Sequence, residues 1–189
     1  YNLGYYANIA PVSPDGSRAI FNNNDDQLQV IDLQTGEISR FTDNRTGYAY
    51  PQWSPDGTKI AFTSIGSDLY VFHKGETYSF GKGQNAVWSD DSQQLLFARH
   101  NTKELKFLGS DIFIANFDGT NQQNLTETEN IHEMTPAFGL NNEIIYQTYN
   151  QKEVILSSIA NTRNQIVLFS HKGKVETKSI EYDKESAKT

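Results

Sequence analysis

The sequence predicts an all-β fold built from repeated four-stranded units, and three observations support this prediction. A turn-forming string recurs along the 189 residues. A second, glycine-containing string follows each copy of the first. Residues that favour strands surround both strings, and no long stretch shows the 3.6-residue periodicity of a helix. Together these features favour short strands joined by tight turns.

The turn-forming string is clearest in "YPQWSPDGTKIAF", which begins at Tyr50. The proline of Ser-Pro-Asp-Gly presets φ for a type I turn, and Gly57 suits the left-handed conformation that follows. Such a turn commonly joins two antiparallel strands. We therefore interpret Asp15 and Asp56, which occupy the same place in two copies, as turn residues and not as catalytic residues.

This string occurs four times. The copies are "APVSPDGSRAIF" at 10, "YPQWSPDGTKIAF" at 50, "NAVWSDDSQQLLF" at 85 and "TPAFGLNNEIIYQ" at 135. Val12, Trp53, Trp88 and Phe138 fall at the equivalent position before the turn, and we expect all four to be buried. A repeat of about 40 residues with four strands is typical of a β-propeller blade.

After each turn the sequence continues with a strand, a glycine-containing turn and a more polar strand. These second strings are "DQLQVIDLQTGEISRF" at 26, "SDLYVFHKGETYSF" at 67, "SDIFIANFDGTNQQNL" at 110 and "NQIVLFSHKGKVETKSI" at 164. We expect four antiparallel blades, at about 1–44, 45–81, 82–126 and 127–180, and a charged tail at 181–189. Extra residues at 98–110 and 149–163 are expected to lengthen the connection between the second and third strands of the last two repeats.

The residues "PQWSPDGTKIAF…DLYVF" resemble the TolB-type propeller repeat, a WD-like blade, and the resemblance extends from about Asn8 to Ile180. It implies that Pro51, Trp53 and Asp56 build the blade. It also implies a periplasmic or secreted location and a role in protein contacts. Propellers of this type usually have about six or seven blades, so we expect these four to be part of a larger ring. Open blade edges would invite association.

Composition and motifs argue against several functions. The net charge of −7 disfavours non-specific binding of nucleic acid, and no apolar stretch is long enough for a membrane span. The chain has no cysteine, which excludes disulfides and thiolate metal sites. Zinc-type histidine spacing, G-x-S-x-G and phosphate-loop motifs are also absent. We expect no catalysis, cofactor or metal in this chain.

Aromatic and basic residues mark the expected contact surface. In a propeller blade, the segment entering the inner strand and the loop joining the second and third strands open on the same face. Loops held by a rigid scaffold are where binding residues concentrate, so we expect a protein or peptide partner there. The candidate residues are Tyr5, Tyr6, Arg45, Tyr48, His100, Lys103 and His132. The alternative is that the tyrosines pack between blades and the insertions only cover a blade edge.

The leading functional interpretation is a non-catalytic interaction or ligand-sensing module of the bacterial cell envelope. By resemblance, this would be a TolB-like scaffold or the periplasmic sensor domain of a membrane-anchored regulator of the CadC or ToxR type. The alternative is the gating propeller of a prolyl-oligopeptidase-like serine peptidase. The hydrolase domain of such a peptidase would lie outside these residues.

Overall fold

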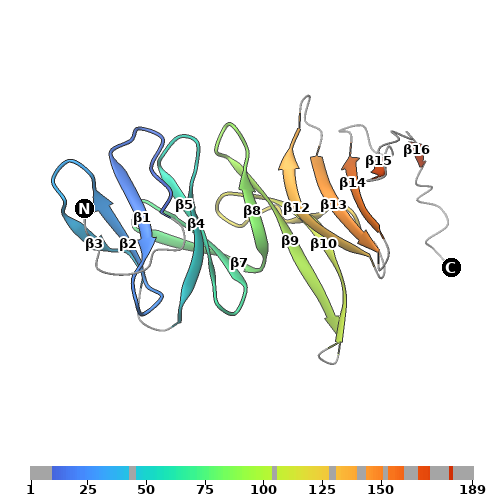
Figure 1. Cartoon of the computed structure of the whole chain (residues 1–189), viewed down its shortest axis with the longest axis horizontal. Coiled ribbons are helices and arrows are strands. Elements are labelled where there is room, and N and C mark those ends of the chain that lie inside the picture. The colour runs from blue at the N-terminus through green and yellow to red at the C-terminus, as the bar shows by residue number, and fades with distance from the viewer. Residues whose placement is uncertain are drawn as a thin grey trace. The chain divides into compact units, whose positions relative to one another are not determined.

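The computed structural model is built from strands and turns, with no helix among the residues that it describes. The described ranges are 10–42, 46–103, 106–127, 131–139, 144–150, 153–159, 166–170 and 179–180. The chain divides into two compact units (Figure 1). The first unit comprises 1–84, 88–95 and 115–122, and the second comprises 85–87, 96–114 and 123–189. The all-β prediction is confirmed.

Two antiparallel sheets belong to the first unit. The first sheet has the order β1 (Arg18–Asn22), β2 (Leu28–Asp32) and β3 (Ile38–Arg40). The second has the order β4 (Tyr48–Trp53), β5 (Lys59–Ser64), β6 (Asp68–His73) and β7 (Glu76–Lys82). The second sheet is thus the complete four-stranded blade that the sequence predicted.

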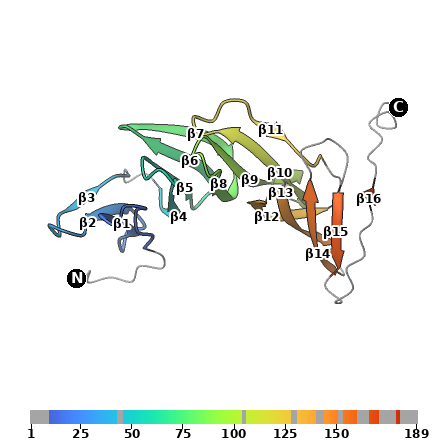
Figure 2. The ribbon, with the colours of Figure 1, turned by 90° about the horizontal axis from the view of Figure 1, so that it is seen from above.

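The other strands join in one larger sheet. Their bounds are β8 (Gln84–Trp88), β9 (Gln94–Lys103), β10 (Lys106–Asn116), β11 (Gln123–Asn124), β12 (His132–Phe138), β13 (Ile144–Asn150), β14 (Glu153–Ile159), β15 (Ile166–Ser170) and β16 (Ser179–Ile180). The order is β16-β15-β14-β13-β12-β10-β9-β8, and β11 pairs with β10. Among the described residues, β10 and β12 are linked by a parallel pair, Ser110 with His132. Figure 2 shows β14 and β15 side by side.

The fourth repeat differs from the prediction in its third strand. Residues 149–163 were expected to form a lengthened connection, but β14 occupies most of this stretch and pairs with β13 from Ile144 to Asn150. The run "EVILSSI" contains three consecutive apolar residues, Val154 to Leu156, two of them β-branched, which favours a sheet strand. The string at 164 therefore supplies β15 after the third strand, instead of being that strand. In the third repeat, the extra residues do lengthen a hairpin, formed by β9 and β10.

A serine and an aspartate two residues later fold the first three turns in the same way. Ser54 Oγ donates to Asp56 at 2.5 Å and accepts the backbone N–H of Lys59 at 3.0 Å. The Asp56 carboxylate in turn accepts a backbone N–H from within the turn. The same contacts recur in the turns at 13–18 and 89–94. The role of these aspartates is therefore structural.

The residues before these turns are equivalent in pairing but not in burial. Val12 pairs with Ala19 as Trp53 pairs with Ile60. Trp88 is buried and Trp53 is partly buried, but 52% of Val12 is exposed, so the prediction was wrong for Val12. Among the described residues Val12 makes one isolated bridge and belongs to no strand, so little of the sheet surrounds it.

Successive turns of the first unit contact one another. The Arg18 guanidinium donates to the carbonyl oxygen of Gly57 at 3.3 Å and lies over the Trp53 ring, 4.7 Å from its centroid. One turn further on, the backbone N–H of Asp56 donates to Ser92 Oγ at 3.0 Å. A side chain of one turn thus forms a hydrogen bond with the backbone of a neighbouring turn.

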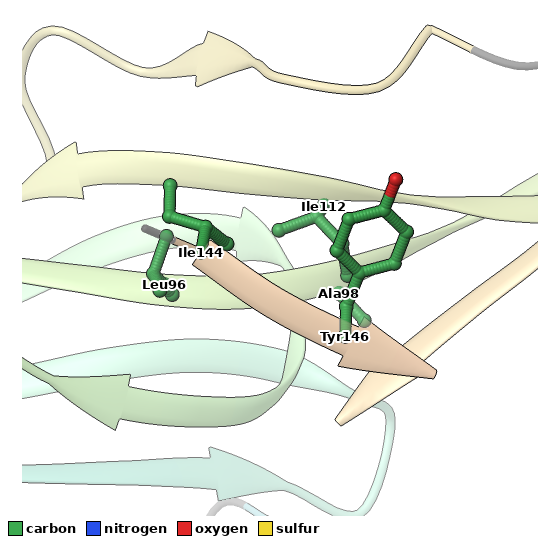
Figure 3. Packing of buried hydrophobic residues seen from close by; sticks show 5 residues of the cluster. All are labelled: Leu96, Ala98, Ile112, Ile144 and Tyr146. Atoms are coloured by element: carbon green, nitrogen blue, oxygen red, sulfur yellow. The ribbon is translucent and has the colours of Figure 1, made fainter. Parts of the chain in front are cut away.

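Each unit has its own hydrophobic core. In the first unit, Ile20, Leu28, Ile60 and Phe62 are buried together. In the second unit, the cluster contains Leu96, Ala98, Ile112, Ile144 and Tyr146, contributed by β9, β10 and β13 (Figure 3). Two of these strands, β9 and β10, also carry residues of the candidate site described below.

Candidate functional site

The candidate site lies on the second unit, where β10 meets β12. The strands β9 and β10 are ten and eleven residues long, and Figure 1 shows their hairpin extending past the ends of β12 and β13. Gly109 allows β10 to approach β12 here, because a Cβ at this position would collide with the backbone carbonyl of Ile131. The backbone N–H of Ser110 donates to that carbonyl at 3.0 Å.

Ser110 holds His132 in one orientation. Its hydroxyl is fully buried, donates to the backbone oxygen of Glu133 at 2.6 Å and accepts the Glu133 N–H at 3.1 Å. The same oxygen lies 3.0 Å from His132 Nδ1. Since the single hydroxyl proton goes to Glu133, we assign the ring hydrogen to Nδ1 and the basic lone pair to Nε2. Ser110 is therefore a positioning residue, and its burial keeps it from reaching a substrate.

An aromatic cluster, His100, Phe107 and His132, forms on this support. The rings of Phe107 and His132 are stacked, with centroids 3.9 Å apart and an interplanar angle of 26°. The His100 ring meets both rings edge-on. Its centroid lies 5.3 Å from the Phe107 centroid and 6.0 Å from the His132 centroid. His100 is exposed, as is 40% of Phe107. The cluster therefore presents ordered aromatic surface to solvent.

The electrostatics of the aromatic cluster favour a neutral His132 ring. Burial lowers the pKa of His132, and the nearby charge of His100 lowers it further. A neutral imidazole stacks on Phe107 without the desolvation cost of a cation. Near neutral pH, the stacked rings of Phe107 and His132 therefore act as an uncharged aromatic surface with polar nitrogen atoms at one edge.

Asp111 fixes the base of the hairpin. Its carboxylate is buried and accepts hydrogen bonds from Asn101 at 2.9 Å and from Asn124 at 2.8 Å. Asn101 belongs to β9, Asp111 to β10 and Asn124 to β11, so one side chain ties three strands together. The aromatic cluster thus sits on a rigid base, which limits the entropy lost when a partner binds.

The remaining candidates from the sequence are placed differently. Tyr5, Tyr6 and Arg45 lie outside the described residues, and Lys103 is described only as the last backbone position of β9. Tyr48 is partly buried in the first unit, where its ring packs edge-on against Phe62 and Tyr70. Its packing matches the alternative reading of the tyrosines as structural residues.

Sequence reasoning named both histidines of the cluster but missed Phe107 and Ser110. Phe107 stands beside Leu108 within a largely polar insertion, and an apolar pair in such a setting was the signal available. Ser110 belongs to no catalytic motif in the sequence. Its role depends on the pairing of β10 with β12, which no local pattern encodes.

The part of the chain that the structure describes contains neither a metal-binding cluster nor a membrane-spanning helix. There, no group of three or more histidine, aspartate or glutamate side chains is arranged to hold a metal ion. The same ranges contain no helix of the length and hydrophobicity that a bilayer crossing requires.

Several solved structures resemble this chain. TolB from Acinetobacter baumannii is 20% identical with a TM-score of 0.57, over 80% of this chain and 40% of that protein. An oligogalacturonate lyase from Vibrio parahaemolyticus is 13% identical with a TM-score of 0.62, over 86% of this chain and 53% of the lyase. The tricorn protease is 14% identical with a TM-score of 0.65, over 94% of this chain and 20% of the protease.

At these identities the likeness concerns the fold alone, and the chain spans well under two thirds of each of these three proteins. A search of curated proteins finds no match. A family model, the TolB beta propeller domain, matches residues 4–180, which is nearly the whole chain. This chain therefore belongs to the TolB β-propeller domain family.

Proposed function

We propose that this chain is a non-catalytic interaction module of the bacterial cell envelope, which binds a protein or peptide partner through the aromatic cluster. The family membership and the TolB neighbours support an envelope location. The proposal includes four blades at about 1–44, 45–81, 82–126 and 127–180, within a larger ring. It covers both a TolB-like scaffold and a periplasmic sensor domain.

The observation that carries this proposal is the stack of Phe107 on His132, with His100 against both rings. Exposed aromatic rings with polar edges are frequent anchors of protein interfaces. Here the rings are held by a buried hydroxyl and by the Asp111 hydrogen bonds, so binding would cost little ordering. Ser110 is buried and its hydroxyl donates to a backbone oxygen, which argues against a role as a nucleophile.

Site-specific photo-crosslinking in the native cell tests this proposal. A photoreactive residue at Thr102, which is exposed and two positions from His100 along β9, lies on the same strand face as His100. We expect one defined adduct with an envelope protein, reduced by Phe107→Ala. The matched control is the same group at Thr77, an exposed threonine on β7 of the first unit. Equal adducts from both positions, or none, would contradict the proposal.

A second candidate is the propeller of a serine peptidase. The observation that favours it is the likeness to the tricorn protease over 94% of this chain. The complete reading frame distinguishes the two candidates. A linked hydrolase domain with a G-x-S-x-G motif would support the peptidase, whereas a helix-turn-helix domain with one membrane span would support the sensor.

A further inference from the structure

A small polar cavity in the first unit offers a second binding site. It has a volume of about 380 Å³ and lies between the β1–β2 connection and β3. The described lining side chains are Asn23, Asp25, Gln27, Gln29 and Arg40, none of which is apolar. The volume is within the range of small-molecule sites, and the polar lining selects for a ligand rich in hydrogen-bonding groups.

Hydrogen bonds hold the loop that lines this cavity in place without a ligand. Asn23 Oδ1 accepts the backbone N–H of Asp25 at 3.0 Å and that of Gln27 at 2.9 Å. The Gln27 side chain is buried, and its Nε2 donates to the backbone oxygens of Asp25 and Thr46, both at 3.0 Å. Asn23 and Gln27 are therefore engaged in holding the loop, and the ligand would meet the other three side chains.

Those three side chains offer both signs of charge. Arg40 Nε donates to the backbone oxygen of Thr42 at 3.0 Å, which steadies the guanidinium and leaves its two terminal nitrogens as donors. The Asp25 side chain takes part in no ion pair or hydrogen bond among the described residues. Opposite charges that line one cavity without pairing can each bind a complementary charge on a ligand.

Gln29 adds an amide that is not held in place. Within the described ranges its Oε1 is buried without a hydrogen-bond partner. A buried acceptor in this state is unfavourable, so rotation of the amide that brings the oxygen to a ligand N–H would be favoured. Gln29 is thus suited to accept a hydrogen bond from a donor group of the ligand.

From this arrangement we propose that the cavity binds a free α-amino acid with a small or polar side chain. The ammonium group would lie against the Asp25 carboxylate, and the carboxylate would accept two hydrogen bonds from Arg40. A simple anion would be opposed by Asp25 and a simple cation by Arg40. Only a ligand that carries both charges uses both groups. This site is separate from the aromatic cluster, so either proposal can fail without the other.

Titration calorimetry with glycine, L-serine and L-glutamine tests this inference, with acetate and methylammonium as single-charge probes. We expect at least one amino acid to bind at least about tenfold more tightly than either single-charge probe. Arg40→Gln and Asp25→Asn should each weaken binding by about tenfold or more. Asp26→Asn, the same change at the neighbouring acid outside the lining, should leave binding unchanged.

Circular dichroism should confirm that the variants fold. The inference would be overturned if none of the amino acids gave saturable binding, or if acetate bound as tightly as the amino acids. Binding that was insensitive to both Arg40→Gln and Asp25→Asn would overturn it equally, because the charged groups would then play no part.

Discussion

The Lys59 ammonium lies 2.7 Å from the Asp56 carboxylate, although only 4% of the Lys59 side chain is exposed. The same nitrogen lies 5.0 Å from the ring centroid of Phe117. A cation withdrawn from water is tolerated only with such partners. Asp56 is therefore both a turn residue and the counterion of a buried lysine.

Asp56→Asn should lower the free energy of unfolding by about 1–3 kcal/mol. This variant keeps the size of the side chain but leaves Lys59 buried without its counterion, and the partial exposure of Asp56 reduces the loss below that of a fully buried pair. Asp15→Asn is the matched control, since Asp15 is an equivalent turn residue with no buried lysine against it. Urea unfolding measures both. An equal loss in the two variants would contradict the role given to Lys59.

Acid should destabilise the first unit between about pH 4 and about pH 2. The hydroxyl of Ser13 and the backbone N–H of Ser17 lower the pKa of Asp15 to about 2. For Asp56, burial acts to raise the pKa, but hydrogen bonds from Lys59 and Ser54 outweigh it and lower the pKa.

An unfolded aspartate has a pKa of about 3.9, so the unfolded chain takes up protons first as the pH falls. The stability due to these two groups is thus complete above about pH 4 and lost as the pH falls through the folded pKa values. Thermal melts at about pH 6, 4 and 3 measure this loss. A Tm that stayed constant down to pH 3 would be inconsistent with the assigned hydrogen bonds.

Gly119→Ala should destabilise the chain more than Gly75→Ala. Both glycines have positive φ, 79° and 87°, so both substitutions meet the backbone strain of about 1–2 kcal/mol. A Cβ on Gly119 would also lie 2.9 Å from the backbone oxygen of Ser79, whereas nothing lies within 4 Å of one on Gly75. Thermal unfolding measures the loss of stability in each variant. Equal losses would contradict the prediction, because the backbone near Ser79 would then move aside at little cost.

Ile112→Ala should cost about 2–5 kcal/mol of unfolding free energy. Ile112 is fully buried in the cluster of Figure 3, and truncation leaves a cavity that the sheet cannot fill. Leu108→Ala, four positions earlier on β10, should cost less than about 1 kcal/mol because 38% of Leu108 is exposed. Denaturant unfolding followed by tryptophan fluorescence measures both, and a small effect of Ile112→Ala would show that this core repacks.

The features that could be predicted from the sequence are those that local chemistry controls. The Ser-Pro-Asp-Gly string specifies its own turn through Ser54 and Asp56, and the repeat spacing indicated the blades. Burial of Val12 was predicted wrongly, because burial depends on which chain segments cover a residue and not on its place in the repeat. The run at 153–159 was taken for a connection because its strand partner is fixed only by long-range pairing with β13.

The candidate site follows the same division. The two histidines were identified because they lie in the insertion at 98–110 and at the entry to an inner strand, which were expected to open on one face, but nothing in the sequence set His100 against His132. That contact depends on the pairing of Ser110 with His132 and on the missing side chain of Gly109. These are tertiary features. Ser110 and His132 are 22 positions apart in the sequence and meet only in the folded chain.

The most direct test of the central claim is the affinity of the partner that is cross-linked from Thr102, measured by calorimetry for Phe107→Ala and Leu108→Ala. Both substitutions remove similarly exposed apolar side chains, 40% and 38%, but Phe107 stacks on His132 and Leu108 is not one of the three rings of the aromatic cluster. The account predicts a Kd at least about tenfold weaker for Phe107→Ala, an unchanged Kd for Leu108→Ala and little change in Tm for either. An unchanged Kd for Phe107→Ala in the folded protein would contradict it.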